Sequence, residues 1–389
     1  MILEDTLTHL SPEEQKRPEK QVIFLTGAAG YVGATLAHIW SQRQDVSLII
    51  ALDKEPKPEL LHGNPKIHYI QGNTVDNFWE EKVRDLQPTI VVHAAWQIRS
   101  FYGKEGNLKQ WRWNVVGSQH VFEYAFEMPS VRRLIYFSTV APYGAMSSNT
   151  LEHFFTEHEP FRKTNYAYAE EKRVVEDVLK EELTYARTDG SKVSVYVVRP
   201  VAITGPRGRK ERIRFGLQSV LSGDLKRVSF SGRLISLLVT WMPATSKWAR
   251  QYVHEDDVAD ITTILALDSN ETNSFEVFNL CPPGPFVTAR DMAKAVGKKF
   301  FYVAPWMVRL AFFLFWHLSF GKIPTSPGGW KSYSYPVLVD GSKITRAYGY
   351  HYKYQSLEAF SNLSGRYETF IKNIKNLKTM PRGKRQKFS

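Results

Sequence analysis

Three glycines at fixed spacing constrain the fold of this chain more than any other feature. Gly27, Gly30 and Gly33 follow a short apolar run, Gln21–Gly27, and open a segment with a helical pattern. In such a loop one glycine allows the tight turn, one lets the backbone approach a pyrophosphate, and one lets helix and strand pack closely. The helix N-terminus then offers unpaired N–H groups to the phosphates. The motif predicts a dinucleotide-binding unit at the start of the fold.

Apolar, β-branched and aromatic runs alternate with longer helical patterns through the first half of the chain. The expected strands are Gln21–Gly27, Val46–Asp53, Lys66–Gly72, Thr89–Ala95, Arg133–Thr139 and Ser194–Val201, and the clearest helices are Leu108–Phe126 and Ala167–Leu183. Near-continuous apolar runs are typical of strands that are buried on both faces. The alternation predicts an α/β fold of Rossmann type with a doubly wound parallel sheet.

This alternation weakens after about residue 205. We expect a helix at Asp256–Leu267, a strand at Phe275–Leu280, and a helix at Ala289–Val296 that Thr288 caps. These pieces should form a smaller, mixed C-terminal substrate-binding lobe over the C-terminal edge of the sheet, where doubly wound folds bind ligands. The predicted units are a flexible arm (1–18), an NAD-binding Rossmann domain (19–205), a partly interleaved substrate-binding lobe (206–365) and a basic tail (366–389).

An acidic residue, Asp53, ends the second predicted strand, 20 residues after Gly33. A carboxylate at this place accepts hydrogen bonds from the adenosine ribose hydroxyls and repels a 2′-phosphate. Asp53 therefore favours NAD over NADP, although Lys54 follows directly and weakens that discrimination. The structural alternative is that Asp53 only caps the end of the strand.

Tyr168 and Lys172 lie four residues apart in a helical stretch, which puts both on one face. A phenol has a pKa near 10, and a nearby ammonium favours its phenolate form, so that tyrosine can act as an acid/base. Tyr166 is a poorer candidate, because the residue four positions on is Glu170, whose negative charge would raise the pKa of Tyr166. Hydroxyls at Ser138 and Thr139 end the fifth predicted strand, where they can hydrogen-bond a reacting substrate oxygen.

Taken in order, these motifs resemble the extended short-chain dehydrogenase/reductases of the NAD-dependent epimerase/dehydratase group, from about residue 21 to about 360. Further matching segments are His93–Ala95, Asn114–Ser118, Ser138–Thr139 with Tyr143–Gly144, Arg199–Pro200 with Gly205–Pro206, and Tyr252–Ala259. The resemblance implies hydride transfer between a nicotinamide and a carbinol carbon. The tyrosine moves the hydroxyl proton, and the lysine lowers the tyrosine pKa and holds the nicotinamide ribose.

The same resemblance assigns the site residues. It implies Thr139, Tyr168 and Lys172 as catalytic residues. The cofactor would contact Gly27, Ala29, Gly30, Tyr31, Val32, Gly33, Asp53, Asn73, Thr74, Ala94, Ala95, Asn114, Tyr168, Lys172, Arg199 and Pro200. The substrate would contact Trp96, Val140, Tyr143, Ala202 and Arg250.

Departures from the family pattern bear on the substrate. Val140 and Ala141 stand where dehydratases carry an acidic pair, and Ala202 stands where nucleotide-sugar epimerases usually carry asparagine. Arg250, in contrast, fits a family arginine that contacts a substrate diphosphate. We expect an oxidoreductase or epimerase that acts on an apolar or amphipathic secondary alcohol, as hydroxysteroid dehydrogenases do. The alternatives are a nucleotide-sugar epimerase and a non-catalytic NAD-binding scaffold.

The segment Phe300–Phe320 is unusually aromatic, and Arg309 and His317 interrupt it. Its uninterrupted part is shorter than the ~20 apolar residues that span a bilayer. Two hypotheses stay open: a buried helix that lines an apolar pocket, or a helix in a membrane interface. Seven of the twelve net positive charges lie between Lys372 and Ser389; we favour a solvated tail over one that binds anionic lipid or nucleic acid.

The remaining expectations concern compartment and partners. A single cysteine, Cys281, leaves no internal disulfide, and no secretory leader is recognisable. We expect a cytoplasmic protein, with membrane association as the alternative. It should bind a small-molecule substrate without specific nucleic-acid binding, and family analogy suggests a homodimer. No histidine pattern indicates a metal site, so we expect His93 and His254 to be structural.

Overall fold

A seven-stranded parallel sheet forms the centre of the computed structural model, which describes residues 20–182, 190–208, 241–269, 275–295, 297–361 and 364–369. The strands are β1 (Gln21–Thr26), β2 (Val46–Asp53), β3 (Ile67–Gln71), β4 (Ile90–His93), β5 (Arg133–Phe137), β6 (Ser194–Pro200) and β11 (Phe275–Leu280). Their order is β11-β6-β5-β4-β1-β2-β3, and every neighbouring pair is parallel. The predicted α/β class is confirmed.

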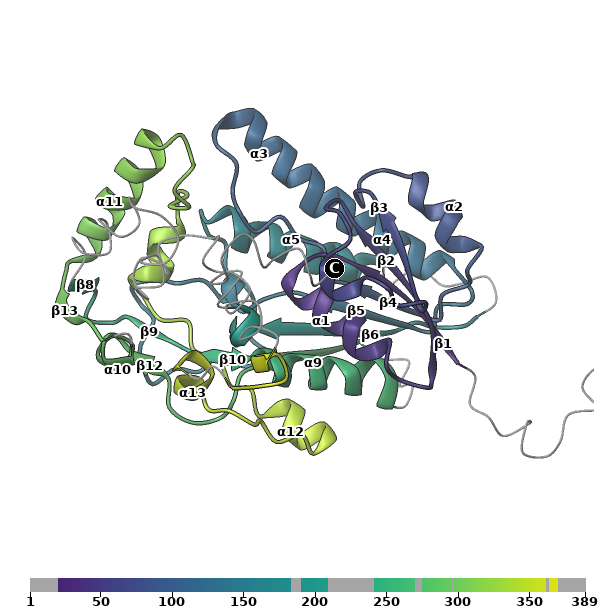
Figure 1. Ribbon diagram of the computed structural model, residues 1–389. Coiled ribbons are helices and arrows are strands. Elements are labelled where there is room, and N and C mark those ends of the chain that lie inside the picture. Colours follow the sequence, from purple (N-terminus) through teal and green to yellow (C-terminus); the bar gives the residue numbers. More distant parts are fainter. Residues whose placement is uncertain are drawn as a thin grey trace, which may run out of the picture.

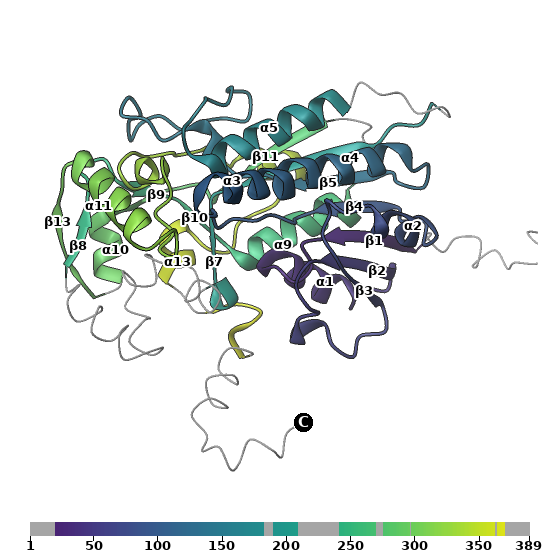
Figure 2. The same ribbon diagram turned by 90° about the horizontal axis from the view of Figure 1, so that it is seen from above.

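Helices cover both faces of this sheet. One face carries α1 (Tyr31–Trp40) and α9 (Glu255–Thr263), and the other carries α2 (Phe78–Arg84), α4 (Gly117–Glu127) and α5 (Ala167–Glu182). Figure 2 shows α4 and α5 on one side and α1 on the other. The alternation of β1 explains both layers, because Ile23 and Leu25 pack toward α1 while Phe24 packs toward α4. Burying each such side chain contributes about 1.5–3 kcal/mol.

The long helix expected at Leu108–Phe126 contains a wide turn. It consists of α3 (Gly103–Trp111), a π-turn η2 (Arg112–Val116), and α4. Asn114 lies inside that turn and is buried. Single π-turns within α-helices are frequent at functional sites.

Strand β11 corrects the predicted boundary between the two units. We expected Phe275–Leu280 in the smaller lobe, but it is the edge strand of the main sheet, with Val277 opposite Val197. Helix α9, expected in the same lobe, packs on the sheet beside α1. Phe278 and Leu280 are fully enclosed, so this late segment completes the core of the first unit.

The smaller lobe lies at one end of the sheet, to the left in Figure 1. It contains three two-stranded pairs: β7 (Ala202–Thr204) with β10 (Tyr252–His254), β9 (Ala249–Arg250) with β12 (Val287–Thr288), and β8 (Trp241–Ala244) with β13 (Lys299–Tyr302). Around them lie α10 (Ala289–Ala295), α11 (Pro305–Leu318), η6 (Gly329–Tyr333) and α13 (Ser356–Ser361). Helix α12 (Lys343–Tyr348) instead packs against β11 of the main sheet. Thr288 caps α10 as predicted, since its hydroxyl accepts the Asp291 N–H at 3.3 Å.

Helix α11 contradicts the hypothesis of a buried helix. Only Phe312 and Trp316 are buried, and most of its other apolar side chains face outward. Within the described ranges, no helix combines the length and apolar character needed to cross a bilayer. The predicted N-terminal arm and all of the basic tail beyond residue 369 lie outside the described residues.

Candidate functional site

The glycine loop packs directly against the segment that follows β4. Gly27 has φ +75°, and a Cβ there would lie 2.5 Å from the Ala95 nitrogen and 2.6 Å from the Ala94 carbonyl carbon. A Cβ at Gly33 would lie 2.2 Å from the Gly27 oxygen. Only glycine allows both close approaches. Because the strand order reverses between β1 and β4, these two loops border the crevice where doubly wound folds bind ligands.

Helix α1 begins at this crevice. Gly30 precedes its first turn, and the opening N–H groups of a helix have no acceptor within the helix. Such a terminus attracts phosphate through its N–H groups and its dipole. The narrow glycine cradle and this helix start are the features that a dinucleotide pyrophosphate requires, so the residues present fit the predicted cofactor.

Asp53 ends β2 beside the glycine loop. One carboxylate oxygen accepts the Ala29 N–H at 2.9 Å, and the other accepts the Glu55 N–H at 2.9 Å. Lys54 directs its ammonium to the Glu55 carboxylate at 2.6 Å and lies 5.3 Å from the Trp113 ring centroid. The positive charge is therefore paired with Glu55, which leaves Asp53 as the charge that faces the loop.

Two further predicted cofactor residues follow β3. The Asn73 side-chain oxygen accepts the Val75 N–H at 3.3 Å. Thr74 is buried below the start of α4, where a Cβ at Gly117 would lie only 2.4 Å from the Thr74 hydroxyl. Thr74 thus sets how closely α4 approaches the β3 loop.

His93 at the end of β4 is a structural residue. Its Nδ1 lies 2.7 Å from the Thr26 hydroxyl and its Nε2 lies 2.8 Å from the Ser118 hydroxyl. Burial, aided by the charge of Lys172, lowers the pKa of His93 to about 3. The ring is neutral at physiological pH and ties β1, β4 and α4 together.

Thr139 and Tyr168 meet at the C-terminal edge of the sheet. Thr139 follows β5, and Tyr168 lies in the first turn of α5. Burial raises the pKa of Tyr168, and the nearby Thr139 hydroxyl opposes that rise. Because Thr139 favours the phenolate form, the pair has a feature that an acid/base tyrosine needs.

Lys172 is buried one turn further along α5. Its ammonium donates to the Phe137 carbonyl at 2.5 Å and lies 3.5 Å from the Trp96 ring centroid. Burial lowers the pKa of Lys172 well below its usual value, against the opposing charges of Glu176 and Glu171. The ammonium is held by β5 and Trp96, not by the Tyr168 hydroxyl.

Trp96 contacts both members of the predicted acid/base pair. Its ring packs edge-on against Tyr168, with centroids 6.4 Å apart, and underlies the Lys172 ammonium. The Trp96 indole N–H is buried without a hydrogen-bond partner among the described residues. A buried donor without a partner costs about 1–3 kcal/mol, so this indole is a group that a bound ligand can satisfy.

Sequence reasoning missed a buried ion pair behind the site. Glu176 binds the Arg199 guanidinium through both oxygens, at 2.6 and 3.1 Å, and also accepts a hydrogen bond from Ser138. A signal was present, because Tyr168, Lys172 and Glu176 are spaced by four and share one face of α5.

Arg199 and Tyr143, both predicted to contact ligands, also contact each other. The Arg199 guanidinium binds Glu176 and the Tyr143 hydroxyl at 2.7 Å. Tyr143 is fully enclosed, and its hydroxyl also donates to Asn279 at 3.1 Å. These side chains thus contribute to the core under the site.

Asn114, predicted to contact the cofactor, lies in a buried hydrogen-bond network. Its amide donates to the buried Glu171 carboxylate at 2.7 Å and to the Gln97 carbonyl at 3.1 Å, while its oxygen accepts the Gln97 N–H at 2.7 Å. Gln110 donates to the same carboxylate at 3.0 Å. The amide therefore connects the π-turn, the loop after β4 and α5.

Tyr166 has a raised pKa, as expected, but from a different cause. Burial contributes most, Tyr168 and Tyr333 add to it, and the Arg250 charge opposes it. Glu170, the neighbour we held responsible, instead pairs with Arg173 at 2.7 Å.

The other predicted substrate residues surround these tyrosines. Arg250 on β9 donates to the Ser332 carbonyl at 3.3 Å, and its guanidinium lies 4.7 Å from the Tyr333 ring centroid. Val140 and Ala202 are half-buried and pack against the cores of the sheet and of the smaller lobe, respectively. The structure thus brings Thr139, Tyr168, Lys172 and Trp96 together, with Arg250 next to Tyr166.

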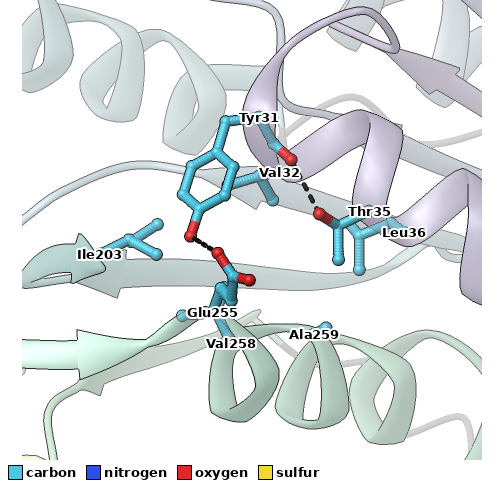
Figure 3. A pocket seen from close by; sticks show the side chains of 8 residues that line it. All are labelled: Tyr31, Val32, Thr35, Leu36, Ile203, Glu255, Val258 and Ala259. Carbon is cyan, nitrogen blue, oxygen red and sulfur yellow. Dashed lines mark hydrogen bonds between the residues drawn. The ribbon is translucent and has the colours of Figure 1, made fainter. Parts of the chain in front are cut away.

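A small pocket lies behind the first turn of α1, between α1, β7 and α9 (Figure 3). Its lining consists of Tyr31, Val32, Thr35, Leu36, Ile203, Glu255, Val258 and Ala259. The Tyr31 hydroxyl donates to the Glu255 carboxylate, which also accepts the backbone N–H groups of Arg207 at 3.2 Å and Gly208 at 3.1 Å. The Tyr31 side chain therefore points toward Glu255 in this pocket.

Comparison with known families gives one match that spans most of the chain. Residues 23–281 match the model of the NAD dependent epimerase/dehydratase family. That range contains the glycine loop, Thr139, Tyr168, Lys172 and the edge strand β11.

Curated relatives are distant. An uncharacterized protein of Mycobacterium tuberculosis is 27% identical over 147 residues, which cover 37% of this chain and 38% of that relative's length. A UDP-glucose 4-epimerase of Lactobacillus helveticus is 25% identical over 269 residues, covering 66% of this chain and 76% of the relative.

Solved structures share the fold over nearly the whole chain. UDP-glucose 4-epimerase of Thermotoga maritima, determined with UDP-glucose, has a TM-score of 0.65 at 19% identity and covers 91% of this chain and 99% of its own. The Bordetella bronchiseptica enzyme WbmG, in complex with NAD and UDP, has a TM-score of 0.64 at 21% identity, covering 93% and 97%. At these identities the similarity shows the fold alone.

Proposed function

The chain belongs to the NAD-dependent epimerase/dehydratase family, and we propose that it is an NAD-dependent epimerase acting on a nucleotide sugar. The observation that carries this proposal is the Thr139–Tyr168 hydroxyl pair at the C-terminal edge of the sheet, next to the glycine cradle. A protein that only bound NAD would not need an acid/base tyrosine with a hydroxyl group beside it.

The structure removes one argument for an apolar substrate. That expectation relied partly on Phe300–Phe320 lining a pocket, but most of α11 faces outward. Arg250 supports the nucleotide-sugar alternative, because its charge lies next to Tyr166 and a guanidinium suits a diphosphate. The solved relatives that match in fold include proteins determined with UDP-glucose and with UDP.

In the proposed reaction, Tyr168 takes the proton of a sugar hydroxyl while Thr139 stabilises the phenolate. Bound NAD would supply the reversible hydride acceptor that inversion of a carbinol carbon without net oxidation requires. Trp96 and Lys172 form the wall beside Tyr168. Val140 and Ala141 provide no carboxyl group after Thr139, so we propose no dehydration step.

NAD rather than NADP is proposed as the cofactor because the Asp53 carboxylate stands beside the glycine loop with Lys54 turned to Glu55. Several solved relatives were determined with NAD. The contacts proposed for the cofactor are the backbone of the glycine loop, Asp53, the Ala94–Ala95 segment and Lys172.

The second candidate is a lipophilic secondary alcohol. Val140 and Ala202 favour it, because both remain apolar at positions predicted to contact the substrate. Thermal protection separates the two: UDP and UDP-sugars should raise the melting temperature if the proposal is right. Protection by sterol-like alcohols with none by UDP would support the second candidate instead.

The decisive experiment incubates the protein with NAD and individual UDP-sugars and follows the sugar protons by NMR. Formation of the epimer without accumulation of NADH is expected, and Tyr168→Phe should abolish it. Arg250→Ala should raise KM about tenfold to a hundredfold, since a charge-assisted contact contributes about 1.5–3 kcal/mol. Lys247→Ala, which alters a neighbouring exposed cation, is the control. If no UDP-sugar is converted, or if Arg250→Ala behaves like the control, the substrate assignment fails.

A further inference from the structure

Helix α11 presents a broad apolar surface to the outside of the smaller lobe. Leu310, Leu314 and Leu318 are spaced by four and form one stripe, and Leu318 is 77% exposed. The exposed apolar side chains around this stripe are Phe301, Tyr302, Trp306, Met307, Phe313, Phe315, Phe320 and Ile323. We call these residues and the stripe the α11 face. Contiguous apolar surface on this scale marks an interaction site.

The charge in the segment that carries the α11 face has one sign. From Met292 to Val339 the chain contains no aspartate or glutamate, but it carries Lys294, Lys298, Lys299, Arg309, Lys322 and Lys331. Lys299, Arg309 and Lys322 are exposed. Aromatic and aliphatic side chains bordered by cations are the composition of helices that lie in a membrane interface.

The position of α11 also favours a planar partner. It lies at the outer edge of the smaller lobe, away from the main sheet (Figure 1). With 14 residues it is too short to cross a bilayer, but it can lie along a surface. Its inner side is anchored, because Phe312 packs against Tyr333 with ring centroids 5.2 Å apart and Trp316 packs against Tyr102 at 5.6 Å.

We propose that the α11 face docks on the surface of an anionic lipid bilayer. The apolar side chains insert at the boundary between headgroups and acyl chains, and the cations bind lipid headgroups. A second copy of the chain is a poorer occupant. In a symmetric contact, Arg309 and Lys322 of one copy would face the same cations of the other, and the segment has no acidic residue to neutralise them. The inference does not depend on the proposed reaction.

Two sets of contacts connect the α11 face to the candidate active site. Tyr333 packs against Phe312 of α11, and its ring also contacts the Arg250 guanidinium. The loop after β4 begins at Trp96, beside Lys172, and ends near Tyr102, whose hydroxyl lies 3.0 Å from His317 Nδ1. A protein docked by α11 therefore holds its active site close to the membrane surface.

Vesicle co-flotation of the full-length protein tests this inference. We expect binding to vesicles of phosphatidylcholine with phosphatidylglycerol, weaker binding to phosphatidylcholine alone, and release by salt. The double variant Leu314→Glu/Leu318→Glu should lower the partition coefficient at least about tenfold. The control is Leu108→Glu, which places the same charge at a leucine of α3 that is 69% exposed, and it should bind like the unmodified protein.

Unchanged melting temperature and NAD affinity show that the double variant is folded. If the unmodified protein does not float with anionic vesicles, or floats equally with neutral ones, the inference is wrong. Binding that survives in the double variant would assign the contact to another part of the chain. A dimer that dissociates in the double variant, seen by analytical ultracentrifugation without vesicle binding, would identify a second copy as the occupant and overturn the lipid assignment.

Discussion

Glu176 on α5 and Arg199 on β6 form an ion pair that is almost completely enclosed, with 2.6 Å between Glu176 Oε2 and Arg199 Nη2. The pair fixes the helix that carries Tyr168 and Lys172 to the strand beside β5. A charge left alone in such a place is costly, because its partner and its hydration are both lost.

Removing one member of this pair should destabilise the protein strongly. We expect Glu176→Ala to lower the free energy of unfolding by about 3–5 kcal/mol, measured by urea denaturation. Asp177→Ala removes the neighbouring carboxylate, which is half exposed and pairs with Arg173; it should cost less than about 1 kcal/mol. Equal costs for the two variants would contradict a structural role for the buried pair.

Tyr168→Phe should retain NAD binding and lose turnover by about 10²–10⁴-fold, because the proton path disappears while the ring remains. Tyr166→Phe should be much milder, since Thr139 lowers the pKa of Tyr168 but has no such effect on Tyr166. Steady-state rates and fluorescence titration of NAD measure the two effects separately. Similar losses in both variants would show that the wrong tyrosine has been chosen.

Asp53→Ala should reduce the preference for NAD over NADP. The carboxylate both repels a 2′-phosphate and holds the Ala29 N–H of the glycine loop, so NAD affinity should fall while NADP affinity falls less or rises. Titration of both dinucleotides gives the ratio. Glu59→Ala, at an exposed carboxylate further along the same loop, serves as the control and should leave that ratio largely unchanged. Tighter binding of NADP by the unmodified protein would contradict the prediction.

Lys172 should make stability depend on pH. Its folded-state pKa lies well below the value near 10.4 of an unfolded lysine, so the unfolded chain binds more protons between those two values. Stability therefore rises with pH through that window, and the cost of burying Lys172 grows as pH falls below about 10.4. We expect Lys172→Met to raise the melting temperature relative to the unmodified protein more at pH 7 than at pH 10.

Lys180→Met is the matched control for that prediction. Lys180 lies on the same helix but is half exposed, so its replacement should shift the melting temperature equally at both pH values. An advantage of Lys172→Met that does not shrink toward pH 10 would show that burial of the charge is not its cause.

The sequence predicts the sheet well because strands buried on both faces leave continuous apolar runs, as in Val46–Asp53. The glycine loop is equally predictable from the sequence, since Gly27 and Gly33 occupy positions where a Cβ would collide with the backbone. These are local requirements, and local requirements leave a pattern in the chain.

Contacts between distant segments were not predictable in the same way. Tyr143 and Arg199 are 56 residues apart, and only the folded chain shows that they bind each other. Asn114 likewise finds Glu171, 57 residues away. The family motif predicts ligand contacts for these polar residues, and the folded chain shows that they also hydrogen-bond to other protein groups in the core.

Strand β11 has a consequence for how the chain folds during synthesis. The main sheet cannot close its β6 edge until residues 275–280 have emerged, well after β6 itself has been made. Until then the nascent sheet exposes an unpaired edge, which is a template for pairing with other chains. We expect a fragment that stops near residue 205 to aggregate, and pairing across so long a sequence separation to slow folding. The late strand thus makes assembly of the first unit depend on translation of the second.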